Sequence, residues 1–151
     1  MKNEHPKRAV IFDFIRTLYD PVSANLYNGA RAMLNEVSED RQLILYSRRD
    51  RSRLELLEEM EIADLFAGAY FVDKKDADNL RDILKAHSLT PETCIVVGDM
   101  ISSELVAAGE LGIETIWFRQ QSFASVLGES YVPTHTVNSI AEMHRLISRL
   151  P

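Results

Sequence analysis

Short apolar runs alternate with longer amphipathic stretches along this chain. The apolar runs predict buried strands at 9–12, 42–46, 69–72, 93–97 and 114–118, and a short sixth strand at 136–137. Apolar residues that recur every three or four positions predict helices at 24–37, 52–60, 77–87, 103–111 and 140–150. Strands that alternate with helices of about ten residues are typical of βαβ units. We therefore predict one α/β domain over 1–151, a three-layer Rossmann-like sandwich around a central, mostly parallel sheet of five to six strands.

Single residues predict the ends of two of these helices, and one segment shows no pattern of a helix or a strand. Ser23 is the expected N-cap of the helix at 24–37, and Gly112 is the expected stop after the helix at 103–111. Residues 120–133 show no clear period, so we expect a loop there.

Composition narrows the class of protein. A net charge of -6 over 151 residues argues against a nucleic-acid partner held by bulk electrostatics. The single cysteine, Cys94, excludes an internal disulfide and a cysteine-based zinc site, and its place inside an apolar run indicates a packing role. No apolar segment approaches membrane-spanning length, so we expect a cytoplasmic protein without a membrane partner.

Polar residues stand where three of the predicted strands end. Asp13, Ser47 and Asp99 each follow such a strand, and Glu104 comes at the start of the next helix. Ligands of open α/β sheets bind beyond the carboxyl ends of the strands, so we expect these side chains to meet at one edge. Asp13 alone is an equally good helix cap or turn residue, and Ser47 alone is more often a turn residue. The set as a whole favours a functional site.

The residue types in this set indicate phosphoryl chemistry. Carboxylates gathered from separate strands, without a histidine or cysteine cluster, suit a hard cation such as Mg²⁺. The Ser47 hydroxyl and a nearby lysine, Lys75 or Lys74, suit an anionic oxygen. A carboxylate nucleophile with a metal ion and a lysine to offset charge is a standard arrangement for transfer of a phosphoryl group.

The segments that end at Thr17 and at Ser47 resemble the first two sequence motifs of the haloacid dehalogenase (HAD) superfamily. The first motif of that family is an apolar strand followed by Asp-x-Asp-x-Thr, and Val-Ile-Phe-Asp13-Phe-Ile15-Arg-Thr17 is similar to it. The second motif is a Ser or Thr at the end of the next strand, which Ser47 matches.

The other two family motifs follow in order, so the resemblance runs over nearly the whole chain. The third motif, a lysine that opens a helix, fits Lys75 best, with Lys74 as the alternative. The fourth motif, Gly-Asp followed by a second acid, is matched by Gly98, Asp99 and Glu104.

The resemblance implies a role for each residue around the phosphoryl group. Asp13 would attack phosphorus and become an aspartyl-phosphate. Thr17 and Ser47 would position the phosphoryl oxygens, and Lys75 would offset negative charge on Asp13 and the phosphate.

The resemblance also implies a Mg²⁺ site. Asp13, Asp99 and the backbone carbonyl of Ile15 would hold the ion. Glu104 would act through a water molecule or by orienting Lys75.

Ile15 departs from the family pattern. The phosphatases of the family have an acid/base aspartate at this position, and isoleucine cannot transfer a proton. General acid–base catalysis contributes about 10²–10⁴-fold, so we expect a weakened or narrowed phosphatase that prefers activated esters or acyl phosphates. Metal binding would survive, because the family ligand at this position is a carbonyl.

Two other functions stay open. A catalytically inactive HAD-like domain that binds a phosphorylated ligand or a protein partner is the main alternative. Dehalogenases of the family also lack the second aspartate, but they close their sites with a cap domain. The intervals from Asp13 to Ser47 and from Ser47 to Lys75 are too short for a cap. We therefore expect a capless protein with an open site, and a second copy or a partner protein is one way to cover it.

Arginines beside the proposed site suggest how an anionic substrate is held. Arg48 and Arg49 follow Ser47, and Arg16 lies between Ile15 and Thr17. We predict that these arginines bind a second anionic group of a small phosphorylated or otherwise anionic substrate. A solvated basic face is the alternative.

Overall fold

A six-stranded parallel sheet forms the centre of the computed structural model, which describes residues 8–120 and 131–151. The spatial order of the strands is β5-β4-β1-β6-β7-β8, and every neighbouring pair is parallel. The strands are β1 (Ala9–Phe12), β4 (Gln42–Arg48), β5 (Gly68–Val72), β6 (Cys94–Gly98), β7 (Glu114–Phe118) and β8 (His135–Val137). This arrangement confirms the predicted α/β fold and its sixth strand.

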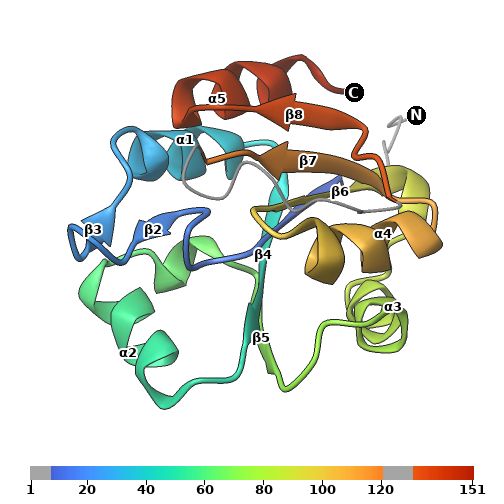
Figure 1. The fold of residues 1–151 in the computed structure, drawn as a ribbon, viewed down its shortest axis with the longest axis horizontal. Helices are drawn as coiled ribbons and strands as arrows, with labels where there is room; N and C mark the ends of the chain where they lie inside the picture. Colours follow the sequence, from blue (N-terminus) through green and yellow to red (C-terminus); the bar gives the residue numbers. More distant parts are fainter. Residues whose placement is uncertain (1–7, 121–130) are drawn as a thin grey trace, which may run out of the picture.

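Helices cover both faces of the sheet, which gives three layers (Figure 1). The apolar side chains of α1, α2 and α5 pack on one face, and those of α3 and α4 pack on the other. The helices are α1 (Ala30–Val37), α2 (Arg51–Glu59), α3 (Ala77–Ala86), α4 (Val106–Glu110) and α5 (Ile140–Arg149), with short turns η1 (Ala63–Leu65) and η2 (Pro91–Thr93).

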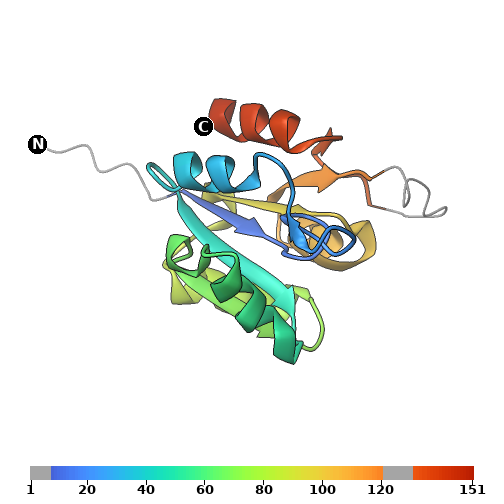
Figure 2. The ribbon, with the colours of Figure 1, turned by 90° about the vertical axis from the view of Figure 1, so that its left-hand side faces the viewer.

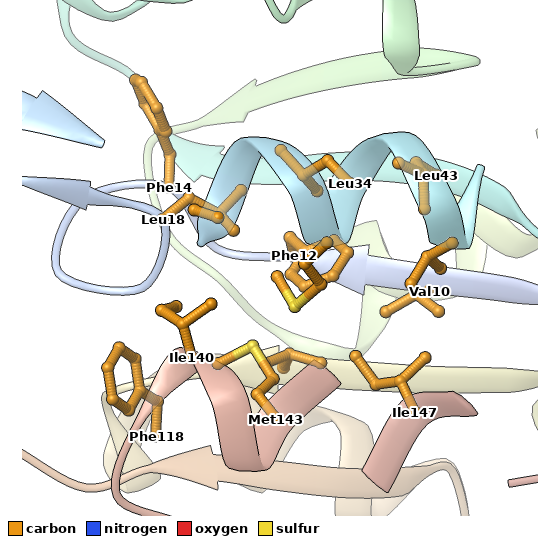
Figure 3. Close-up of a cluster of buried hydrophobic side chains, with 14 of the residues drawn as sticks. Val10, Phe12, Phe14, Leu18, Leu34, Leu43, Phe118, Ile140, Met143 and Ile147 are labelled. Atoms are coloured by element: carbon orange, nitrogen blue, oxygen red, sulfur yellow. The ribbon is translucent and has the colours of Figure 1, made fainter. Parts of the chain in front are cut away.

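The side chains of β1 point alternately to the two faces of the sheet, so this one buried strand contributes to the core on both faces. Val10 and Phe12 belong to the cluster under α1 and α5, whereas Ala9 and Ile11 belong to the cluster under α3 and α4. Figure 3 shows Phe12 between Leu34 of α1 and Met143 of α5. Because both faces are covered, β1 reads as a continuous apolar run.

The helix predicted at 24–37 is wrong in its first turn and a half. A hairpin of β2 (Tyr19–Asp20) and β3 (Asn25–Leu26) occupies this part of the chain, and Ser23 lies in its turn rather than at a helix cap. The helix begins only after Gly29, whose φ of 85° suits glycine. Figure 2 shows the hairpin beyond the carboxyl end of β1.

The helix predicted at 103–111 is two pieces. A π-helical turn, η3 (Ile101–Leu105), precedes α4, and Ser103 breaks the helical path with φ -120° and ψ -107°. Such turns often occur at functional sites. This one directs the Glu104 side chain back over Gly98.

Between the strand ends, the described chain contains no inserted cap domain. The β2–β3 hairpin and α1 connect Asp13 to β4, and α2, η1 and β5 connect Ser47 to Lys75. Of the predicted loop at 120–133, residues 121–130 lie outside the described residues. None of the helices in 8–120 and 131–151 is both long and apolar enough to cross a membrane.

Candidate active site

The carboxyl edge of the sheet holds a cavity of about 310 Å³. Asp13 after β1, Lys75 before α3, and Asp99 and Glu104 after β6 all line it. The Asp13 backbone N–H donates to the Val97 carbonyl at 2.9 Å, so Asp13 continues the pairing of β1 with β6. Figure 2 shows that the strands point their carboxyl ends to this same side. Residues from separate strand ends therefore lie around one cavity, as the sequence predicts.

Asp13 is held by two partners. Lys75 donates through Nζ to Asp13 Oδ1 at 2.7 Å, and Thr17 donates through Oγ1 to Asp13 Oδ2 at 3.3 Å. Asp13, Thr17 and Lys75 are all buried. The carboxylate therefore keeps a fixed orientation while one edge still reaches the cavity.

The structure separates the two candidate lysines. Lys75 forms ion pairs with Asp13 at 2.7 Å and Glu104 at 3.3 Å, whereas Lys74 has no described carboxylate within 4.0 Å. Burial alone would lower the pKa of Lys75, but the carboxylates of Asp13 and Glu104 raise it above the usual value. Lys75 therefore stays charged at neutral pH.

Tyr46 positions Lys75 from beneath. The Lys75 Nζ lies 5.4 Å from the centre of the Tyr46 ring, a cation–π distance. The Tyr46 hydroxyl donates to Asn79 Oδ1, and Asn79 completes the capping box of α3 with Asp76. Strand β4 therefore fixes the start of the helix that presents the lysine.

Three carboxylates gather at the floor of the cavity. One oxygen each from Asp13, Asp99 and Glu104 lies within 4.8 Å of the others. Burial, with the nearby Asp13 and Glu104 charges, raises the pKa of Asp99 to about 8. Burial and the Asp13 charge raise the pKa of Glu104 to about 7. The three carboxyl groups are therefore costly to ionise together in this buried place, and a bound cation would reduce that cost.

The donor set fits a hard divalent cation. It is made of carboxylate oxygens, without a nitrogen or sulfur ligand, and Mg²⁺ prefers such ligands. The indole Nε1 of Trp117 donates to the Asp99 carbonyl at 3.1 Å and so fixes the backbone that carries one of these acids. Ile15 is half-buried and lines the same cavity.

Gly98 allows Glu104 to reach this cluster. A Cβ atom built on Gly98 would lie 2.0 Å from Glu104 Oε1 and 2.5 Å from its Cγ, far closer than atoms can approach. Glu104 is 1% exposed and accepts hydrogen bonds from Lys75 Nζ at 3.3 Å and the Met100 N–H at 3.4 Å. The Gly-Asp pair therefore has a steric function as well as a chemical one.

The structure changes the assignment of the arginines. Arg16 and Arg48 line the cavity as predicted, but Arg49 does not; its Nε pairs with Asp73 Oδ1 at 3.6 Å on the exposed surface. Arg53 takes the place expected of Arg49, since it lines the cavity and donates through Nη1 to Ser47 Oγ at 2.8 Å.

Ser47 is buried and does not itself line the cavity. Its hydroxyl accepts a hydrogen bond from Arg53, which does line it. The sequence placed Arg53 in the first turn of a predicted helix, but nothing in the spacing indicated which arginine would turn back to the serine. The lining residues Met100, Ser102 and Ser103 were also missed, because the π-helical turn that presents them was expected to be regular helix or loop.

Comparisons with known proteins agree with this geometry. Residues 73–143 match the family model described as HAD-hydrolase-like. This part of the chain is therefore similar to the HAD-like hydrolases, and the fold is shared with solved HAD-superfamily structures. The match starts at the loop that carries Lys75 and includes Asp99 and Glu104.

One curated relative matches part of the chain. It is a glyceraldehyde 3-phosphate phosphatase of Pyrococcus furiosus, 35% identical over 77 residues, which are 49% of this chain and 30% of that protein. The chain thus matches less than a third of the length of this relative.

Solved structures share the fold at low sequence identity. The L-2-haloacid dehalogenase of Xanthobacter autotrophicus has a TM-score of 0.79 at 12% identity, over 96% of this chain and 100% of that chain. The core domain of a protein provisionally assigned as a phosphoglycolate phosphatase, from Streptococcus pneumoniae, has a TM-score of 0.70 at 21% identity, over 97% and 98%. A provisionally assigned HAD hydrolase of Bacillus subtilis, solved with magnesium bound, has a TM-score of 0.72 at 12% identity, over 81% and 56%.

Proposed function

We propose that the protein is a Mg²⁺-dependent phosphohydrolase that acts on small phosphorylated molecules through Asp13. The observation that carries this proposal is the buried Asp13 carboxylate, which Lys75 contacts at 2.7 Å and Thr17 at 3.3 Å beside two further acids. The part-length likeness to a phosphatase and the magnesium-bound structural neighbour support the same class.

The first step is attack of Asp13 on phosphorus. The Oδ atom that faces the cavity forms the new P–O bond, the bond from phosphorus to the leaving oxygen breaks, and an aspartyl-phosphate results. Lys75 stays beside Asp13 and offsets negative charge on the transferring group, and Thr17 holds the second carboxylate oxygen in place. Water then attacks the aspartyl-phosphate, which releases phosphate and restores Asp13.

A divalent cation would be held by Asp13, Asp99 and the backbone carbonyl of Ile15, with Glu104 beside them. When bound, it would neutralise charge on the phosphoryl oxygens. Glu104 contributes without touching the substrate, because its 3.3 Å contact orients Lys75.

Ile15 sets the range of substrates. The leaving oxygen departs without a proton donor at this position, so esters with basic leaving groups react slowly. We expect turnover of acetyl phosphate and p-nitrophenyl phosphate, whose leaving groups need little protonation.

The deciding experiment compares wild type with Asp13→Asn on these two compounds in the presence of Mg²⁺. We expect turnover by wild type and none above background by Asp13→Asn. Equal rates would refute the proposal and leave the second candidate, an inactive domain that binds a phosphorylated ligand or a partner protein. Ile15 is the observation that favours this second candidate.

A further inference from the structure

The cavity carries more positive charge than one phosphoryl group requires. Arg16, Arg48, Arg53 and Lys74 line its wall, while Lys75 is paired with carboxylates at the floor. The chain as a whole has a net charge of -6, so four cations around one opening run against its general composition. This excess of positive charge would be balanced by a ligand with more negative charge than a single phosphate.

Formal charges give the size of the excess. Three carboxylates and Lys75 leave the floor at minus two, which a bound divalent cation would cancel. A phosphoryl group then brings at most two negative charges against the three positive charges of Arg48, Arg53 and Lys74. At least one of these cations remains for another anionic group of the same ligand.

Three of the wall cations have no carboxylate of their own. Arg48, Arg53 and Lys74 have none within 4.0 Å among the described residues, whereas their neighbour Arg49 pairs with Asp73 at 3.6 Å. At the start of α2, the N-cap Asp50 accepts from the Ser52 N–H and interacts with Arg53 only through space, so no carboxylate of the described residues contacts Arg53 directly. A bound anion would offset the positive charge of these three cations.

These cations are neighbours of the residues assigned to the phosphoryl group, and they are not those residues themselves. Arg48 directly follows Ser47, Arg53 donates to the Ser47 hydroxyl at 2.8 Å, and Lys74 directly precedes Lys75. Each is therefore adjacent in sequence, or hydrogen-bonded, to a residue assigned to the reacting group. Arg48 ends β4, Arg53 lies in the first turn of α2 and Lys74 lies in the loop after β5, and all three line the cavity.

We propose that Arg48, Arg53 and Lys74 form a second anion subsite, so that the substrate carries a carboxylate or a second phosphate besides the phosphoryl group that is removed. This proposal rests on the proposed function for the reacting group but concerns a different part of the ligand. Arg48 and Lys74 select for the second anion, and Arg53 links the subsite to Ser47.

A matched pair of chromogenic esters tests the subsite in turnover. The pair is p-nitrophenyl phosphate and 3-carboxy-4-nitrophenyl phosphate, which differ by one carboxylate on the leaving group. We expect wild type to favour the carboxylated ester roughly tenfold or more in kcat/KM, the scale of one charge-assisted contact. Arg48→Ala and Lys74→Ala should bring the ratio close to one, and the surface control Arg49→Ala should keep it. An unchanged ratio in Arg48→Ala and Lys74→Ala would overturn the subsite.

A binding measurement separates this inference from the proposed function. Calorimetry compares 3-phosphonopropionate with propylphosphonate, which lacks the carboxylate, in Asp13→Asn and in Asp13→Asn combined with Arg48→Ala. If wild type hydrolyses neither ester, yet Asp13→Asn binds 3-phosphonopropionate more tightly and Arg48→Ala removes the difference, the proposed function fails and the subsite stands. Equal affinities for the two phosphonates would overturn the subsite whether or not the esters are hydrolysed.

Discussion

Gly98→Ala is the sharpest steric perturbation that the structure offers. The added methyl group would lie 2.0 Å from Glu104 Oε1, 2.5 Å from Cγ and 2.6 Å from Cδ, so Glu104 must leave its position. Overpacking of a filled interior costs about 1–3 kcal/mol. Loss of a charge-assisted hydrogen bond to the buried Lys75 costs about 1.5–3 kcal/mol more. We expect a total loss of about 3–5 kcal/mol in the free energy of unfolding.

Chemical denaturation of four proteins measures this effect and its cause. They are wild type, Gly98→Ala, Glu104→Ala and the double variant. Alanine at position 104 removes the three atoms that lie nearest to the new methyl group, so Gly98→Ala should cost under about 1 kcal/mol in that background. Heating should show the same pattern, with about 2–4 °C lost per kcal/mol in a chain of this size. An equal cost of Gly98→Ala in both backgrounds would refute the steric explanation.

Three further predictions concern the same site. Replacement of Lys75 by methionine should cost about 3–5 kcal/mol in unfolding free energy, because two buried carboxylates lose their partner; a cost below 1 kcal/mol in urea unfolding would contradict this. The pKa of Asp99, raised to about 8, means that the folded state binds more protons than the unfolded state between about pH 4 and 8. Stability of wild type should therefore fall relative to Asp99→Asn as pH rises through this window in Mg²⁺-free buffer, and a constant difference between the two proteins would count against the assignment. Ile15→Asp should raise kcat/KM for an unactivated phosphate ester by about 10²–10⁴-fold, with Ile15→Asn as the matched control without a proton to transfer; equal rates for the two variants would show that the site lacks some other component.

The strands and their ends were predictable because burial on both faces leaves a simple signature. Phe12 and Val97 end continuous apolar runs, and the next residues, Asp13 and Gly98, open the site. Parallel pairing then determines that such ends meet at one edge, so the convergence of Asp13 and Asp99 could be predicted before any coordinates.

The turns that shape the site could not be predicted in the same way. Leu26 continues the helical spacing of α1, yet it lies opposite Tyr19 in a hairpin, because strands of two residues are too short to show alternation. The π-helical turn at Glu104 depends on a fit between that side chain and Gly98, which no local pattern records.

The contacts of the arginines could not be predicted from their spacing in the sequence. Arg48 and Arg49 are equivalent in sequence, but Arg48 lines the cavity and Arg49 turns to Asp73 on the surface. Arg53 reaches Ser47 only because α2 folds back over the end of β4. Such contacts depend on the tertiary path of the chain rather than on residue type.

Direct detection of a phosphorylated Asp13 tests the central claim most plainly. The protein is mixed with acetyl phosphate and Mg²⁺, quenched in acid, digested and examined by mass spectrometry for a phosphoryl group on the peptide that contains Asp13. The account predicts that this peptide gains one phosphoryl group in wild type and none in Asp13→Asn. Turnover without any label on this peptide, or a label that persists in Asp13→Asn, would contradict it.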